Sequence, residues 1–222
     1  MDCWQLRTLD QLRRALPSST IELYGSATTP ELLDGWSDLD VVVHAAAPFD
    51  VARVLGGTVW SFQDSSDEDG VQTVRVVMTD GRRVDLSVPG GGACLPAPTT
   101  DNSPRFDSAL AASRFGRGAD LIGLHLVLGV LRDALVQSML RADHLTGTSP
   151  HRSSTALDTC AGSSLELLRA PLGPGTALAV YRHYSDVRAE VDPTFVADLS
   201  GLSQVLAHGS DDSSGEAPTH SA

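Results

Sequence analysis

The fold of this chain is indicated first by residues 25–40, GSATTPELLDGWSDLD, in which a Gly-Ser pair precedes an Asp-x-Asp pair. The run before it, Ile21 to Tyr24, is short and apolar and predicts a strand that feeds a tight turn. The run Asp38 to His44 contains three consecutive valines and predicts a second strand. Side chains of a strand alternate between its faces, so Asp38 and Asp40 are expected to share one face.

Two carboxylates on one strand face predict a metal site. Asp38 and Asp40 would lie ~6–7 Å apart, where like charges raise each other's pKa unless a cation lies between them. Asp85 lies in the run Arg82 to Val88, which predicts another strand, and it joins the patch if the two strands are neighbours. Oxygen ligands suit magnesium or manganese better than zinc. Three carboxylates could hold two magnesium ions, which lower the pKa of an attacking hydroxyl and stabilise the oxygens of a phosphoryl transfer.

The Gly-Ser pair indicates phosphate binding because it lies before the Asp-x-Asp strand. Gly25 would let the backbone approach a phosphate closely, and a short helix after it would offer N–H groups to an anion. The Ser26 hydroxyl could add a hydrogen bond to a terminal phosphate. The pair is therefore the candidate nucleotide-binding turn.

These features resemble the polymerase-beta-like nucleotidyltransferase superfamily. The positions that agree with its signature in type, order and spacing are Gly25, Ser26, Asp38, Asp40 and Asp85. The resemblance covers roughly residues 4–90. It implies a small mixed sheet with flanking helices, an NTP bound as its metal complex, and release of pyrophosphate.

The resemblance, together with the helical pattern of the second half, implies an α+β protein with a small mixed-sheet nucleotidyltransferase domain followed by a helical domain. Residues 1–90 form the expected catalytic domain, and residues 91–105 a linker, because glycines and prolines follow Val88. Residues 106–208 form the expected helical domain. Residues 209–222 are small, polar and acidic, which is typical of a disordered tail.

Further elements follow from periodicity and turn signals. Asp64 to Gly70 is polar and predicts a solvated loop. The remaining expected strands are Thr58–Phe62 and Val71–Met78. The expected helices are Trp4–Leu16, a short one ending at Leu33, Phe49–Leu55, Asp120–His144, Ser163–Arg169, Thr176–Val191 and Thr194–His208.

The helical remainder resembles that of antibiotic nucleotidyltransferases, which act on aminoglycosides or lincosamides and use a helical domain to form the acceptor pocket. The resemblance implies a carboxylate general base, and Asp85 is the first candidate because it would lie nearest the metals. Asp133 is the second, although an ion pair with Arg132 or plain exposure explains it better.

Three arginines have two interpretations each. Arg83 shares the strand face of Asp85, so it either neutralises a triphosphate or holds the carboxylates in place. Arg114 and Arg117 either reach phosphates from the helical domain or form a solvated helix end, and the solvated end is favoured.

Charge and cysteine content exclude several classes. The formal net charge is -12, which disfavours nucleic acid as a partner and favours cations near the carboxylates. The three cysteines are far apart and predict neither a disulfide framework nor a zinc site, so a cytoplasmic protein is expected. No secretory signal is visible, and the apolar stretch Leu121 to Leu131 falls short of the ~20 residues that span a bilayer. A buried helix, and no membrane partner, is expected there.

The leading hypothesis is a magnesium-dependent enzyme that transfers AMP from ATP to a hydroxyl of a polar small molecule, such as an antibiotic. The expected partners are then ATP and this acceptor. A homodimer is also compatible with the sequence. The alternative is a regulatory protein similar to the minimal nucleotidyltransferase antitoxins, which bind or modify a partner protein. A nucleotide-binding protein without turnover is disfavoured, because an intact set of like charges is destabilising without metals.

Overall fold

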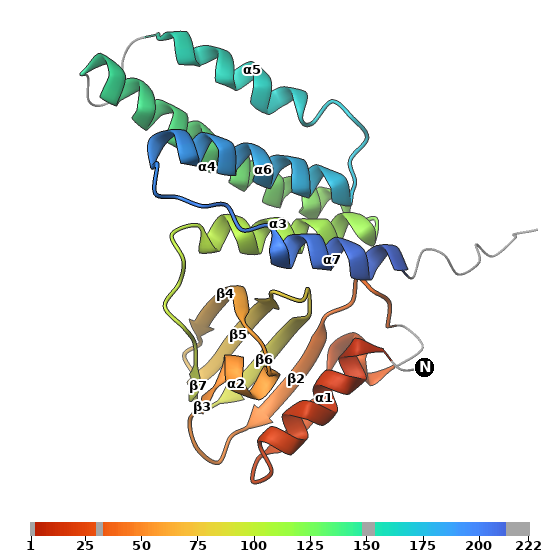
Figure 1. Ribbon diagram of the computed structural model, residues 1–222. Helices are drawn as coiled ribbons and strands as arrows, with labels where there is room; N and C mark the ends of the chain where they lie inside the picture. The colour runs from red at the N-terminus through yellow and green to blue at the C-terminus, as the bar shows by residue number, and fades with distance from the viewer. Residues whose placement is uncertain (1–2, 30–32, 148–153, 212–222) are drawn as a thin grey trace, which may run out of the picture.

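The computed structural model describes residues 3–29, 33–147 and 154–211. It shows an α+β protein, which confirms the predicted fold class, with helices on both sides of a mixed five-stranded sheet (Figure 1). The strands are β1 (Thr20–Leu23), β2 (Leu39–His44), β3 (Phe49–Asp50), β4 (Val59–Ser66), β5 (Val71–Met78), β6 (Arg83–Pro89) and β7 (Ala93–Cys94). The helices are α1 (Trp4–Ala15), η1 (Gly25–Thr28), α2 (Val51–Leu55), α3 (Asn102–Gly116), α4 (Asp120–Thr146), η3 (Ala156–Asp158), α5 (Thr159–Glu166), α6 (Pro174–Val191) and α7 (Ser200–Asp211).

The sheet has the strand order β1-β2-β6-β5-β4, while β3 and β7 form a separate two-stranded sheet. In the larger sheet β2 and β6 are parallel and the other neighbours are antiparallel. The parallel pair aligns Asp40 with Asp85, which confirms the prediction that their strands are neighbours. A tight turn joins β5 to β6, and Gly81 adopts the positive φ that the Asp-Gly pair predicts there.

One face of the sheet packs against α1 and α2. Leu9 and Leu12 of α1 and Val51 of α2 are buried in this core. The sheet contributes alternate residues of β2 and β6, which are Leu39, Val41, Val43, Val84, Leu86 and Val88. Because side chains alternate along a strand, the residues between them face the opposite side of the sheet.

The opposite face is covered by α3 and α7, with α4 and α6 above them and α5 outermost (Figure 1). Trp60 of β4 is buried in this second core, and its Nε1 donates to the backbone oxygen of Asp198, 3.1 Å away. The Asn102 side chain exchanges two hydrogen bonds, of 3.0 and 2.8 Å, with the backbone of Phe62. The start of α3 is therefore fastened to the outer strand β4.

Helix α4 is packed on one side only. By length and composition it is the single helix among the described residues that could cross a membrane, and 33% of its most apolar window is buried. It packs against α3, α5 and α6, while Leu121, Leu128 and Met139 are exposed. The helix expected over Asp120–His144 is therefore present, but only about a third of its most apolar window is buried, whereas the sequence predicts a buried helix.

The hairpin of β4 and β5 is longer than predicted. β4 continues to Ser66, so the predicted loop Asp64–Gly70 was wrong for its first three residues. Asp64 pairs with Val74 and its side chain accepts from the Gln72 amide at 2.9 Å. The polar stretch forms a strand because it lies at the exposed edge of the sheet, where no apolar face is needed.

Two other helix boundaries differ from prediction. Phe49–Asp50 forms a short strand, and Asp50 caps the helix that follows by accepting from the Arg53 N–H at 2.7 Å. The last helix begins at Ser200 where Thr194 was expected. Asp192 accepts from both the N–H and the hydroxyl of Thr194, so this stretch forms a turn.

The segments around the predicted domain boundaries are described in part. Helix α3 begins at Asn102, inside the expected linker 91–105, and α7 reaches Asp211, inside the expected tail 209–222. Residues 212–222 lie outside the described residues, and so do residues 30–32 of the short helix expected before Leu33. Helix α5 begins at Thr159, four residues before the expected start at Ser163, and it ends at Glu166.

Candidate metal and nucleotide site

The three predicted carboxylates converge at the start of the parallel strands. Each of Asp38, Asp40 and Asp85 offers an oxygen that lies within 4.8 Å of the others. Asp40 and Asp85 are direct neighbours across β2 and β6, and Asp38 precedes β2 on the same face. The cluster lies on the face of the sheet that α3 covers, because the alternate residues enter the opposite core.

Gly25 lies against this cluster. It has a φ of 62°, which favours glycine, and it begins the short 3-10 helix η1. A Cβ atom at this position would clash with Oδ2 of Asp40. The Tyr24 N–H donates to the Asp40 backbone oxygen at 3.2 Å, which holds the turn beside β2. Gly25 is therefore needed for the close approach of the turn to Asp40, and half-buried Ser26 follows it directly.

Two arginines of the sheet contact or surround the carboxylates. Arg75 on β5 forms an ion pair with Asp85, with Nε 3.0 Å from Oδ2, and its side chain is 42% exposed. Arg83 on β6 is buried, and its Nη2 has no hydrogen-bond partner among the described residues. Arg75 was not among the residues predicted for the site; the loop of residues 79–81 sets the register that places it opposite Asp85.

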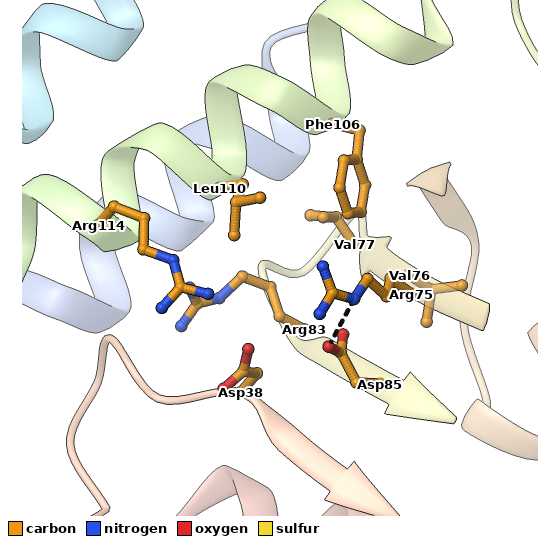
Figure 2. A pocket seen from close by; sticks show the side chains of 9 residues that line it. All are labelled: Asp38, Arg75, Val76, Val77, Arg83, Asp85, Phe106, Leu110 and Arg114. Carbon is orange, nitrogen blue, oxygen red and sulfur yellow. Dashed lines mark ion pairs between the residues drawn. The ribbon is translucent and has the colours of Figure 1, made fainter. Parts of the chain in front are cut away.

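Helix α3 completes the site from above. A small hollow of about 20 Å³, partly open to solvent, lies between α3 and the sheet. Figure 2 shows Phe106, Leu110 and Arg114 of α3 facing Arg83 and the two aspartates Asp38 and Asp85 across it. The hollow is thus lined by both halves of the chain.

The interpretation of Arg114 and Arg117 as a solvated helix end is wrong for Arg114 and holds for Arg117, which is exposed and does not line the hollow. Arg114 lines the hollow, and its Nε is buried without a hydrogen-bond partner among the described residues. Arg117 donates to the Ser37 hydroxyl at 3.2 Å and lies 3.7 Å from the Asp34 carboxylate. The end of α3 is therefore fastened to the loop that carries Asp38.

The carboxylates are held at raised pKa values. Burial, and then the negative charge of Asp38, raise the pKa of Asp85 to about 7 and that of Asp40 to about 6. Arg75 acts in the opposite direction on both. Burial lowers the pKa of Arg83 to about 10, so Arg83 stays charged at neutral pH. The arginines near the cluster therefore compensate only part of its negative charge.

The donor set fits a magnesium or manganese ion. The three close ligands are all carboxylate oxygens, which these hard cations prefer. The pKa values of Asp40 and Asp85 are raised first by burial and then by the charge of Asp38, so the ionised cluster is unfavourable without a further positive charge. A divalent cation among the three oxygens would supply it.

The stability of the metal-free protein should depend on pH. The folded-state pKa values of Asp40 and Asp85 lie above their ordinary values, so their contribution to stability is full below about pH 4 and is lost as the pH rises through about 6 and 7. We expect the melting temperature in EDTA to fall between about pH 5 and pH 8. Magnesium should raise it more at pH 8, because the ionised cluster binds the cation.

Calorimetry of the wild type and of Asp85→Asn at each pH checks this expectation. The substitution removes one titrating group, so the variant should lose a large part of the pH dependence. Equal pH profiles for the two proteins in EDTA would show that Asp85 does not titrate in this range.

Asp133, the second candidate for a general base, lies elsewhere. It lines a separate polar hollow with Tyr184 and Arg188, and this hollow shares no residue with the one beside the carboxylates. Its carboxylate forms an exposed ion pair with Arg132 at 3.3 Å. The structure therefore leaves Asp85 as the candidate base among the two.

Comparisons with known proteins give no family assignment. No family model matches the chain, and no curated protein does. Among solved structures, the polymerase core of TRAMP, an RNA surveillance complex, has a TM-score of 0.29 and 16% identity, over 82% of this chain and 57% of that chain. An aminoglycoside 6-adenyltransferase from Bacillus subtilis has a TM-score of 0.33 and 12% identity, over 96% of this chain and 100% of that chain. These scores are too low to support a fold or a function, so the proposal below depends on the site itself.

Proposed function

We propose that this chain is a nucleotidyltransferase that transfers a nucleoside monophosphate, with AMP from ATP as the first candidate, to a hydroxyl of a polar small molecule. The single observation that carries the proposal is the convergence of Asp38, Asp40 and Asp85 within 4.8 Å. The glycine turn on one side and the arginine-lined hollow on the other support it. A structural site for a cation alone would need neither of these.

The carboxylates would hold magnesium, or manganese, between the strand ends. The bound cation would supply positive charge to the α-phosphate and lower the pKa of the attacking hydroxyl. The acceptor oxygen forms a bond to the α-phosphorus while the bond to the pyrophosphate oxygen breaks. Asp85 is the candidate group to take the hydroxyl proton, because its carboxylate lies in the cluster where the cation and the attacking hydroxyl would meet.

Phosphate oxygens would be bound from two sides. Gly25 leaves room for a close approach at the turn, and the Ser26 hydroxyl can donate one hydrogen bond. Arg83 and Arg114 each have a buried N–H group without a partner among the described residues, and a buried cationic donor without an acceptor is unfavourable. Phosphate oxygens that enter the hollow as its lining side chains rearrange would satisfy both donors through charge-assisted hydrogen bonds.

The lining of the hollow bears on the acceptor. Three carboxylates, those of Asp38, Asp40 and Asp85, lie near three arginines, Arg75, Arg83 and Arg114, so the site carries no net formal charge before a cation binds. A neutral polar acceptor, of which a lincosamide-like antibiotic is one example, therefore meets no opposing charge there.

The activity is tested by incubating the protein with α-labelled ATP, magnesium and a panel of hydroxylated acceptors. The panel should contain lincosamides, aminoglycosides and simple sugars, with labelled GTP, CTP and UTP in parallel. The expected result is a labelled adduct and stoichiometric pyrophosphate. Folded protein that binds no NTP and yields no adduct with any of them would remove the proposal.

Arg114→Gln should weaken NTP binding about tenfold or more. The change removes a cationic donor that lines the hollow, and a hydrogen bond from a charged group contributes about 1.5–3 kcal/mol. Equilibrium binding of ATP with magnesium measures the effect. Arg132→Gln is the matched control, because Arg132 is exposed on α4 and lines no part of the hollow. Equal affinities for the two variants would show that Arg114 does not contact the phosphates.

A further inference from the structure

Arg75 forms an ion pair with one of the expected cation ligands. Its Nε lies 3.0 Å from Oδ2 of Asp85, and the dashed line in Figure 2 marks this contact. Asp85 is in turn one of the three carboxylates that offer oxygens within 4.8 Å of one another. As long as no cation is bound, the Arg75 guanidinium therefore supplies positive charge to a carboxylate that the cation would use.

Arg75 has the largest effect of any cation on two of the carboxylates. Burial and the charge of Asp38 raise the pKa values of Asp40 and Asp85, and among the cations Arg75 lowers both values most. Arg83 lowers the pKa of Asp85 to a smaller extent. Arg75 is thus the main compensating charge of the cluster.

The pair of Arg75 and Asp85 differs from a structural ion pair in its exposure. The Arg75 side chain is 42% exposed, whereas the Arg105 side chain in its pair with Asp101 is 9% exposed. Val74, which precedes Arg75 on β5, is buried in the core on the opposite face of the sheet. A partly exposed ion pair contributes little to stability, so Arg75 can leave Asp85 without unfolding the sheet.

A cation at the cluster would compete with Arg75 for Asp85. Magnesium binds carboxylate oxygens at about 2 Å, which is closer than the 3.0 Å between Arg75 and Asp85. The ion also carries twice the charge of a guanidinium, and two positive groups at one carboxylate repel each other. Bound magnesium would therefore weaken the attraction between Asp85 and Arg75.

A released Arg75 would have phosphate oxygens as its alternative acceptors. Arg75 lines the same small hollow as Arg83 and Arg114. In the proposed function, the triphosphate enters this hollow as the lining side chains rearrange. A phosphate oxygen accepts charge-assisted hydrogen bonds from a guanidinium, so the triphosphate can replace the carboxylate as the partner of Arg75.

We propose that Arg75 is a phosphate-binding residue that changes its partner during the reaction. It is paired with Asp85 before a cation binds, and it binds the triphosphate once the magnesium complex of the NTP has displaced it from Asp85. The inference rests on the proposed function, because it takes an NTP as the ligand. One side chain thereby holds the ligand carboxylate in the free protein and the phosphates in the complex.

Manganese binding without nucleotide tests the first step. Electron paramagnetic resonance measures the dissociation constant for Mn²⁺ in the wild type, Arg75→Gln and Arg114→Gln. Arg75→Gln should bind manganese several-fold more tightly than the wild type, because the ion no longer competes with a guanidinium at Asp85. Arg114→Gln removes the same charge from the hollow but no ion pair with the cluster, so its gain in affinity should be smaller.

ATP binding in the presence of magnesium tests the second step. Arg75→Gln should weaken ATP binding about tenfold, because a charge-assisted hydrogen bond to phosphate is lost. Arg75→Lys keeps a positive charge and should restore part of the ATP affinity. An arginine that serves only the fold would not change the affinities for manganese and ATP in opposite directions.

The matched control is Arg182→Gln. Arg182 is an exposed arginine of α6 that lines no part of the hollow, and its substitution removes the same charge. This variant should bind manganese and ATP as the wild type does. Melting temperatures of all variants check that they fold, and Arg75→Lys keeps the test open if Arg75→Gln does not.

Two outcomes would overturn the inference and leave the proposed function intact, provided that the wild type binds both manganese and ATP. The first is weaker manganese binding by Arg75→Gln, which would show that Arg75 orients Asp85 for the cation and stays with it. The second is equal ATP affinity of Arg75→Gln and Arg182→Gln. A wild type that binds no ATP would overturn the proposed function and this inference together.

Discussion

Replacement of Asp40 by asparagine is expected to lower the transfer rate by about 10³-fold or more. The amide cannot supply the negative charge of a cation ligand, and a bound metal contributes several kcal/mol to stabilising the transition state, at 1.36 kcal/mol for each factor of ten. Asp38→Asn should have a similar effect. Both variants should keep the fold, because asparagine has nearly the shape of aspartate and lowers the repulsion within the cluster.

Rate and cation binding should be measured together. Manganese binding by electron paramagnetic resonance reports the loss of the ligand even when no acceptor is known. Asp69→Asn is the control, because this residue is an exposed aspartate in the turn between β4 and β5. Near wild-type manganese affinity in Asp38→Asn and Asp40→Asn would contradict the metal assignment and with it the proposed function.

Removal of Asp101 should produce the largest loss of stability. Asp101 is 1% exposed, lies 2.9 Å from Nε of Arg105, and accepts a hydrogen bond of 2.7 Å from the Tyr181 hydroxyl. Asp101→Ala would leave the Arg105 charge and the Tyr181 hydroxyl buried without this partner. Breaking a buried pair in this way costs about 3–5 kcal/mol, so the denaturation midpoint should fall sharply.

Asp101→Asn separates the contribution of the Asp101 charge to stability from that of its hydrogen bond with Tyr181. The asparagine oxygen can still accept from the Tyr181 hydroxyl, so we expect a smaller loss than in the alanine variant. Urea denaturation followed by circular dichroism measures both. A loss of less than 1 kcal/mol in Asp101→Ala would show that Arg105 is sufficiently held by Asp198, which lies 3.2 Å from its Nη1.

The carboxylate cluster could be predicted because it depends on local rules. Alternation along a strand places Asp38 and Asp40 on one face, and the Asp-Gly turn returns the chain so that Asp85 can join them. The pairing of Arg75 with Asp85 depends on a three-residue loop, residues 79–81, whereas a two-residue Asp-Gly turn would place Val76 opposite Asp85. Strand periodicity and turn chemistry therefore determine most of the sheet side of the site.

The helical side of the site could not be derived in the same way. Arg114 lines the hollow only because α3 crosses the sheet from Phe62 to the loop that carries Ser37, and no local signal sets this path. The start of α3 was missed because Asn102 lies among prolines and polar residues typical of a linker. Its side chain acts through a tertiary contact with β4, which outweighs local propensity.

Helix α3 is held at both ends, by Asn102 on β4 and by Arg117 on the loop before β2, and Phe106 and Leu110 lie over the sheet between these points. A hinge between the sheet and the helical layers would have to break both attachments, so we expect the two layers to move together. Substrates would then reach the carboxylates through rearrangement of side chains, among them Arg75, whose side chain is 42% exposed. The catalytic cycle that we propose therefore needs no domain closure.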